Sequence, residues 1–435
     1  MSRDGILHSA TGGKAQGLQR TVLQATSTMA IDSFWTPVET NYQKHVPLEE
    51  QSLEASVTFP LVVRTARKCT KEALLREIST LASRHHDENA VSPLRKLLDA
   101  HGGAIQFREL PLHSPEDFSE FLEVLAGDGP YAWKPHTHRG SEVLRKPLAK
   151  HVMTANEGPP SHYIGWHNEY SMSPAHPAYV VLYCQEAPTS GGETSLVNGI
   201  ALHDRMRNAE PEFVQKSIDS GIAYKVPHTA VQRDGTLGGA GVYKSGAFGP
   251  PDDAQNESWK CDMQDTPENR KGVEDRIRQL AREGGWDQDH SQTSGNVPAW
   301  QQKGFDWTWN EDGGLEVLHR MPGVRVHPTQ NVPALFNSLS TRYHNAKKYN
   351  TFEPPFTYRD DDGVEKSFWP PHFAGHEKDE PIPRTWLATL DKYQKELASD
   401  VQWHTGDVLI VDCNMLGGLG LGAGKCLQVS GISPA

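Results

Sequence analysis

The chain has 435 residues, and its 43 Lys and Arg against 55 Asp and Glu give a formal net charge of −12. This acidic balance argues against nucleic-acid binding as the main task, because such proteins concentrate Lys and Arg, although one local cation still suffices for a small anionic substrate. No apolar run approaches the roughly 20 residues of a membrane span. The five scattered cysteines include no CxxC pair, which argues against a disulfide framework or a thiolate zinc site.

Residues 1–45 are predicted to form an N-terminal tail that is partly disordered. The first residues, up to about position 30, are poor in acid and carry Arg3, Lys14 and Arg20. Three interpretations stay open for them: a disordered tail, an upstream start before Met29, and a weak transit peptide. We therefore expect a cytoplasmic protein, with a mitochondrial location as the alternative.

Amphipathic patterns predict helices in the first third of the chain. Apolar residues at i, i+3 and i+4 spacing predict a helix over 71–83, and a second helical pattern surrounds Leu97. A short strand is expected at 104–108, after a Gly turn. Ser114 followed by Pro115 and two acids predicts the cap and first turn of a third helix.

The rest of the chain alternates between short strands and helices. Strands are predicted at 179–183, 194–197, 314–319, 324–327 and 408–411. Helices are predicted at 201–207, 211–220, 273–282 and 383–399. The stretch 234–302 is rich in Gly, Asp, Gln and Asn and is predicted to be a long insertion. We expect a single domain over 46–435, mainly β with flanking helices (α+β), as in a distorted jelly roll.

The segment Trp166-His167-Asn168-Glu169-Tyr170 carries the strongest chemical signal. In an extended strand, side chains two residues apart point to the same face, so His167 and Glu169 are predicted to project together, with Asn168 turned away. An imidazole and a carboxylate held in this way supply two positions of the two-His-one-carboxylate triad, which leaves open sites on Fe(II). Alone, such a pair is a weak signal, because the chain holds 21 His and 55 acids.

The context of this pair resembles the taurine-dioxygenase (TauD/TfdA) and clavaminate-synthase-like family of Fe(II)/2-oxoglutarate-dependent dioxygenases. In that family an HxD or HxE pair precedes a Gly-Gly-[Asp/Glu]-Thr turn, and here Gly191-Gly192-Glu193-Thr194 follows the pair. The likeness extends from about His101 to Asp412.

The resemblance implies a double-stranded β-helix (jelly roll) and a metal-dependent oxidoreductase. It implies that His167 and Glu169 bind Fe(II) and that the hydroxyl of Thr194 binds a carboxylate of 2-oxoglutarate, with O2 as the other co-substrate. An ordinary strand threonine is the alternative for Thr194. The implied reaction is hydroxylation, desaturation, epoxidation or ring closure of a small metabolite, with specialised metabolism as one setting.

The chain departs from the family pattern near its end. The family closes its triad with a His, and about ten residues further an Arg pairs with the far carboxylate of 2-oxoglutarate. Counting from Asp412, the His position falls on Gly418, and no His or Arg follows His404. Lys425 offers a point charge without the two-pronged contact of an Arg. His404 precedes the predicted strand and is expected in a surface turn, well away from the metal.

Two functions therefore stay open: an active dioxygenase, and an impaired or truncated relative that acts at most as a small-molecule binder. One hypothesis for the unusual terminus is intron read-through, because Gln428-Val429-Ser430 can be encoded by CAG-GTA-AGT, which reads as a donor site. A hydrolase lacks support, since no G-x-S-x-G is present. The expected partner is a small-molecule substrate, and the oligomeric state is not predicted.

Other residues have two interpretations each. The pair His136 and His138 is interpreted as part of a loop near the mouth of the site. The aromatic stretches 305–309 and 368–372 fit core packing or the lining of a substrate pocket. Phe336-Asn337 resembles a family phrase on the substrate side.

Overall fold

The computed structural model describes residues 33–47, 56–83, 91–127, 132–136, 139–140, 145–155, 165–231, 241–243, 247–249, 265–286, 297–359, 363, 365–421, 426–428 and 432–434. Most of the predicted N-terminal tail, together with His138 and Lys425, lies outside these ranges. The tail prediction therefore stays a prediction for 1–32, whereas residues 33–45 contribute to two strands, β1 (Trp35–Pro37) and β2 (Lys44–Pro47).

The largest sheet joins strands from distant parts of the chain. Its order is β1, β4 (Leu61–Thr65), β5 (Ala104–Arg108), β21 (Val408–Asp412), β9 (Tyr179–Cys184), β23 (Cys426–Gln428), β8 (Val152–Thr154) and β7 (Pro147–Ala149), with β6 (Trp133–Pro135) and β24 (Ile432–Pro434) off this path. β4 and β5 are parallel. β21 lies between β5 and β9, antiparallel to both, with Ile410 opposite Ile105 on one side and Val181 on the other.

A second sheet faces the first across a shared core. Its strand order is β20 (Ser399–Val401), β10 (Thr194–Asn198) and β22 (Leu416–Leu421). One buried cluster contains side chains of both sheets: Val180, Leu182, Leu409 and Val411 from the first, and Leu196, Val401 and Leu416 from the second. The apolar area removed from water between the two sheets therefore holds them together.

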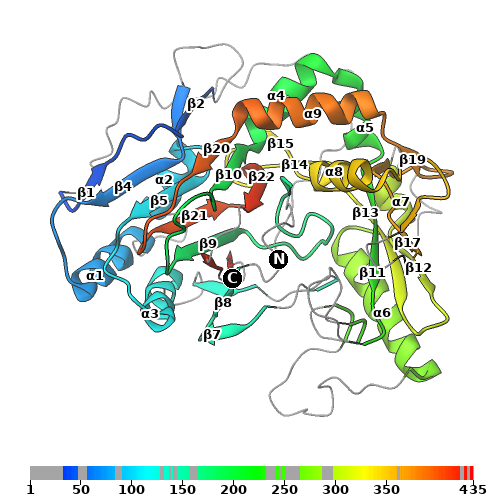
Figure 1. Ribbon diagram of the computed structural model, residues 1–435, viewed down its shortest axis with the longest axis horizontal. Helices are drawn as coiled ribbons and strands as arrows, with labels where there is room; N and C mark the ends of the chain where they lie inside the picture. The colour runs from blue at the N-terminus through cyan, green and yellow to red at the C-terminus, as the bar shows by residue number, and fades with distance from the viewer. Residues whose placement is uncertain are drawn as a thin grey trace.

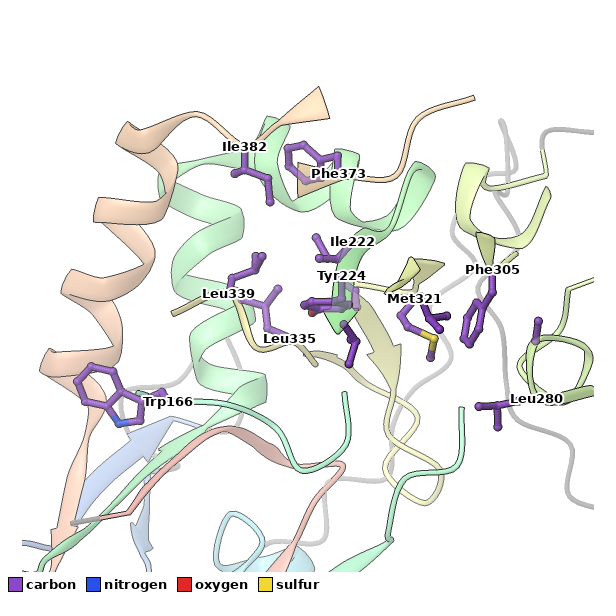
Figure 2. Packing of buried hydrophobic residues seen from close by; sticks show 14 of the residues in the cluster. Trp166, Ile222, Tyr224, Leu280, Phe305, Met321, Leu335, Leu339, Phe373 and Ile382 are labelled. Atoms are coloured by element: carbon purple, nitrogen blue, oxygen red, sulfur yellow. The ribbon is translucent and has the colours of Figure 1, made fainter. Parts of the chain in front are cut away.

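A third sheet carries a separate buried core. Its strand order is β12 (Asp306–Trp309), β13 (Leu315–Met321), β11 (Ile222–His228), β18 (His372–Phe373) and β19 (Glu380–Pro381). Along β11, Tyr224, Val226 and His228 are buried, whereas Lys225 and Pro227 between them are more exposed. Such alternation is typical of a strand with one face on a core. Figure 2 shows Tyr224 and Met321 between Leu335 and Leu339 on one side and Phe305 on the other.

The smaller sheets are hairpins. They pair β2 with β3 (Ser56–Phe59), β14 (Val324–Val326) with β15 (Pro333–Leu335), and β16 (Thr357–Arg359) with β17 (Glu365–Ser367).

Helices cover the sheets. They are α1 (Lys71–Ala82), α2 (Pro93–Ala100), α3 (Pro115–Ala126), α4 (Gly199–Ala209), α5 (Pro211–Asp219), α6 (Pro267–Glu283), α7 (Ala299–Lys303), α8 (Leu339–Tyr349) and α9 (Arg384–Leu397). The predicted cap of α3 is confirmed, because Ser114 Oγ accepts from Asp117 N at 3.1 Å. In Figure 1, α4 and α9 run side by side across the top of the molecule.

The described chain is thus an assembly of mixed sheets and helices. The helices and strands predicted from the sequence are present, with ends that differ by a few residues, except for the extended segment expected at His167–Glu169. The helix predicted in the insertion is α6, which contributes Val273, Ile277 and Leu280 to the same buried cluster as β11 and β13. Within the described ranges, no helix is long and apolar enough to cross a membrane.

Candidate active site

The two predicted metal ligands lie side by side. His167 Nε2 is 3.4 Å from Glu169 Oε1. Two ligand atoms bound at about 2.1 Å and at right angles on one metal lie roughly 3 Å apart, so the pair fits two adjacent coordination positions. Glu169 is buried and His167 is partly exposed. The pair can therefore be reached from solvent through the imidazole.

The backbone between the two residues differs from the extended strand that we predicted. His167 is an isolated bridge residue, and a turn begins at Glu169. Ser171 N donates to Asn168 O at 3.1 Å, and Tyr170 adopts the left-handed conformation, with φ of 54°. The side chains nevertheless meet, because this turn brings the carboxylate towards the imidazole.

The orientation of the His167 ring is determined by a backbone carbonyl. Its Nδ1 lies 2.8 Å from Gly165 O, to which Thr341 Oγ1 also donates, at 2.9 Å. Because a carbonyl only accepts, Nδ1 carries the proton in the neutral ring and Nε2 keeps its lone pair. A metal-binding histidine commonly has such a partner on its other nitrogen. This arrangement supports the fit of the pair to a metal ion.

Asn168 anchors the segment between the two ligands. Its side-chain Oδ1 accepts from Asn337 N at 2.9 Å, and its backbone N–H donates to Asn337 O at 3.1 Å. Its Nδ2 donates to the backbone carbonyls of Leu416 and Cys413, the latter at 3.4 Å. No local pattern predicted that Asn168 connects the pair to residues this distant.

The charge of Glu169 affects the pKa of His167. Burial lowers the pKa of His167, but the hydrogen bond and negative charge of Glu169 outweigh burial, and the net shift is upward. The charge of Glu169 also acts on the thiol of Cys413. Burial raises the pKa of its thiol well above the usual value, and the charges of Glu169 and Asp412 raise it further. The negative charge of Glu169 therefore acts on both His167 and Cys413.

Thr194 lies in the core between the first two sheets. It is buried at the start of β10, and its Oγ1 accepts from Trp403 Nε1 at 2.9 Å. The hydroxyl proton then remains available as a donor. Its neighbour Ser195 points to the opposite face of the strand, where its Oγ accepts from Trp166 Nε1 at 3.0 Å. β10 thus contacts the segment of the pair through Ser195, and its role towards 2-oxoglutarate through Thr194 stays a prediction.

The expected third ligand position is occupied by glycine. In β22, Gly418 pairs with Val197 of β10. His404, the remaining imidazole near the end of the chain, is half exposed in a turn, and its backbone N–H donates to Asp407 Oδ2 at 2.8 Å. The expectation of a surface turn at His404 is confirmed. The described residues thus place two metal-binding side chains together at this site.

A second group of side chains could bind a metal ion by its geometry, but these side chains form an ion-pair network. Ligand atoms of Asp99, His327 and Asp412 lie within 4.8 Å of one another. The guanidinium of Arg95 lies among them, 2.7 Å from both carboxylates and 3.0 Å from His327 Nε2. A cation is therefore already present in this group, so a metal ion would have to displace it. We assign it to stability, since it joins α2 to β21 and to the turn after β14.

His136 was expected in a loop near the mouth of the site, whereas His176 and Arg325 were not predicted as site residues. Burial lowers the pKa of His136 to about 4, and the charge of Glu169 acts on it in the opposite direction. The charge of His136 contributes to lowering the pKa of His176. Arg325 Nη1 lies 3.0 Å from His176 Nδ1. Because they come from separate segments, no local motif could have revealed this grouping.

The family model described as taurine catabolism dioxygenase TauD, TfdA family matches residues 76–416, most of the chain. The chain belongs to that family. This TauD/TfdA chain is 25% identical over 313 residues to a clavaminate synthase-like protein of Arabidopsis thaliana, covering 71% of this chain and 74% of that protein. It is therefore an oxidoreductase of the 2-oxoglutarate-dependent dioxygenase class, whose members use Fe(II), 2-oxoglutarate and O2.

Solved structures of similar chains were also found. A putative alpha-ketoglutarate-dependent taurine dioxygenase from Burkholderia xenovorans is 12% identical, with 90% of this chain and 94% of that chain covered and a TM-score of 0.37. The PvcB protein from Pseudomonas aeruginosa is 14% identical, with 91% and 93% covered and a TM-score of 0.37.

Proposed function

We propose that this TauD/TfdA chain oxidises a small-molecule metabolite at a metal bound by His167 and Glu169. The observation that carries the proposal is the 3.4 Å approach of Nε2 to Oε1, with the imidazole oriented by Gly165 O. Fe(II), once bound, supplies the activation of O2 that no side chain can provide. Hydroxylation is the default outcome; desaturation, epoxidation and ring closure are variations, and specialised metabolism is one setting.

The protein residues hold the reactants in position. Glu169 contributes the negative charge that balances the cation, and Asn168 holds both ligands against the turn at 413–416. Thr194 is the proposed hydrogen-bond donor to a carboxylate of 2-oxoglutarate. We also propose that the two facing sheets are the walls of a double-stranded β-helix. Their shared core supports this.

Titration of the purified protein with Fe(II) and 2-oxoglutarate, without oxygen, tests the metal site. We expect the visible metal-to-ligand charge-transfer band to appear in the wild type and to be lost in His167→Ala and Glu169→Ala. His404→Ala is the matched control, because it removes a half-exposed imidazole and should leave the band unchanged. A band that survives in His167→Ala, or disappears in His404→Ala, contradicts the assignment of ligands.

The alternative is an impaired relative that binds a small molecule without oxidising it. The observation that favours it is Gly418 at the expected position of the third ligand. If this alternative holds, the wild type shows no band, and Gly418→His gives one by adding the missing imidazole. A wild-type band of normal intensity, with 2-oxoglutarate consumed in air, excludes the alternative.

A further inference from the structure

Two cysteines lie opposite each other on neighbouring strands of the largest sheet. Cys184 is the last residue of β9, and Cys426 is the first residue of β23. The two strands are antiparallel, and their register places Cys426 directly opposite Cys184, with Leu427 opposite Tyr183 next to them. Because the two cysteines are far apart along the chain, only the assembled sheet brings them together.

The backbone of Cys184 shows which kind of cross-strand pair this is. Its N–H donates to Asp407 O at 2.9 Å, and its carbonyl accepts from Gly406 N at 2.9 Å. Both backbone groups therefore point to the side of β9 on which β21 lies, away from β23. In an antiparallel ladder the position that faces away from these groups is a non-hydrogen-bonded pair, so Cys184 and Cys426 form a pair of that type.

A pair of this type has the geometry that a disulfide requires. Its Cα atoms lie about 4.5 Å apart, closer than in a hydrogen-bonded pair. Disulfides join Cα atoms that are roughly 4.4–6.8 Å apart. Directly opposite residues also share one face of the sheet. On β9 that face is the one whose residues Val180, Leu182 and Cys184 belong to the core between the first two sheets.

Among the described residues one more cysteine contributes to this core, and it lies too far away to compete. Cys413 N donates to Ala178 O at 2.9 Å, so Cys413 lies beside the end of β9 at which Tyr179 is the first residue. A strand advances about 3.3 Å per residue, which separates the two ends of β9 by about 16 Å. Cysteines whose Cα atoms are more than about 7 Å apart cannot be bridged without backbone movement.

We propose that Cys184 and Cys426 are a redox pair that forms a disulfide and fastens β23 to β9. In this structure Cys184 is a thiol. The oxidant is a peroxide: one thiol attacks an oxygen of the O–O bond and becomes a sulfenic acid, and a first water leaves. The second thiol then attacks this sulfur, the S–S bond forms, and the hydroxyl leaves with a proton as a second water. Two electrons thus pass from the sulfurs to hydrogen peroxide.

The bond closes a long loop of the chain. The strands β10, β21 and β22 lie between the two cysteines in sequence, so the link encloses three of the strands that pack around the shared core. Cross-linking a long loop stabilises a protein chiefly by restricting the unfolded chain. A disulfide in the core is also shielded from reductants, because exchange requires access to a sulfur. The oxidised form is therefore the more stable one.

Peptide mapping after oxidation tests the pair on the unaltered chain. The purified protein is treated with hydrogen peroxide, the remaining thiols are alkylated, and the monomer is digested and analysed by mass spectrometry. We expect a peptide that links Cys184 to Cys426 and a loss of two of the five thiols, which dithiothreitol restores once the chain is unfolded. A monomer without this linked peptide, or with Cys184 linked to another cysteine, refutes the inference.

Thermal unfolding gives an independent measurement of the same bond. Peroxide treatment should raise Tm of the wild type by about 5 °C and leave Tm of Cys426→Ala unchanged. Cys69→Ala is the matched control, because Cys69 is a partly exposed cysteine outside the pair, and its Tm should rise as in the wild type. Equal shifts in the wild type and Cys426→Ala would contradict the proposal. If Cys426→Ala does not fold, the mapping of the wild type decides alone.

Discussion

Asn168 and Asn337 are joined by two hydrogen bonds that run in opposite directions. The backbone N–H of Asn337 donates to Asn168 Oδ1 at 2.9 Å, and the backbone N–H of Asn168 donates to Asn337 O at 3.1 Å. Both residues are buried. The residue between the two metal ligands is thus held by a segment far along the chain, and the geometry of the ligand pair depends on that contact.

Replacing Asn168 by Ala removes the side-chain half of this contact. The buried N–H of Asn337 and the carbonyls of Cys413 and Leu416 lose their partner, which costs about 1–3 kcal/mol for each group left unsatisfied. We expect a lower free energy of unfolding and weaker Mn(II) binding, although no ligand is removed. Chemical denaturation and metal titration measure the two effects. Asn41→Ala, at an exposed turn residue, is the control and should change neither.

Thr194 provides a second test. Thr194→Val keeps the shape of the side chain but leaves the buried Trp403 Nε1 donor without its acceptor. We expect a loss of stability of about 1–3 kcal/mol. If Thr194 also binds 2-oxoglutarate, Kd for 2-oxoglutarate rises while Mn(II) affinity stays constant. Thr194→Ser retains the hydroxyl and should restore both values. A Kd that is the same in all three proteins limits Thr194 to a structural role.

Two buried histidines predict a dependence of stability on pH. Within the described chain, both ring nitrogens of His228 and Nε2 of His319 lack a hydrogen-bond partner. Burial lowers the pKa of His228 to about 4 and, together with the His228 charge, that of His319 to about 3. In the unfolded chain these pKa values return to about 6.5.

The unfolded state therefore binds more protons than the folded state below pH 6.5. The free energy of unfolding is therefore highest above that pH. It decreases as the pH falls towards 4, by about 1.4 kcal/mol per pH unit for each imidazole. We expect His228→Leu to lose less stability than the wild type between pH 7.5 and pH 5. If the unfolding midpoint falls by the same amount in the two proteins between pH 7.5 and pH 5, His228 does not cause the pH dependence.

Arg95 is expected to be important for stability. The side chain of Asp412 is fully buried, and Arg95 Nη1 lies 2.7 Å from its Oδ2. Arg95→Met leaves this carboxylate without its cation, and breaking a buried pair from one side costs about 3–5 kcal/mol. Arg278→Met removes two surface ion pairs, with Glu274 and Asp275, and should cost about 1 kcal/mol or less. Urea unfolding measures both, and similar values for the two variants would contradict the role of Arg95.

Local patterns predicted much of the fold but missed particular elements. α3 was predictable, because Ser114 and Pro115 mark its start. α8 was missed, since its sequence, LSTRYHNAKKY, shows no clear apolar stripe. β11 was missed although its buried residues alternate, because Pro227 interrupts the pattern of a strand.

The candidate site shows the same limit. The two-residue spacing of His167 and Glu169 was visible in the sequence, even though the backbone that brings them together is a turn. The contacts of Asn168 with Asn337 and Leu416 span 169 and 248 residues. The approach of Arg325 to His176 also joins distant segments. Such pairings depend on how the sheets assemble, so the spacing of residues along the chain does not predict them.

The place of β21 in the largest sheet has a consequence for the newly made chain. β5 and β9 are synthesised long before residues 408–412 but pair with β21 rather than with each other. Until that strand emerges from the ribosome, β5 lacks a neighbour along one edge, and β9 lacks one along both, because β23 and β24 are made later still. Both strands are rich in apolar residues. Unpaired edges of this kind bind other chains. A polypeptide that stops before Val408 should therefore aggregate during synthesis, and it should depend on chaperones more than the full chain does.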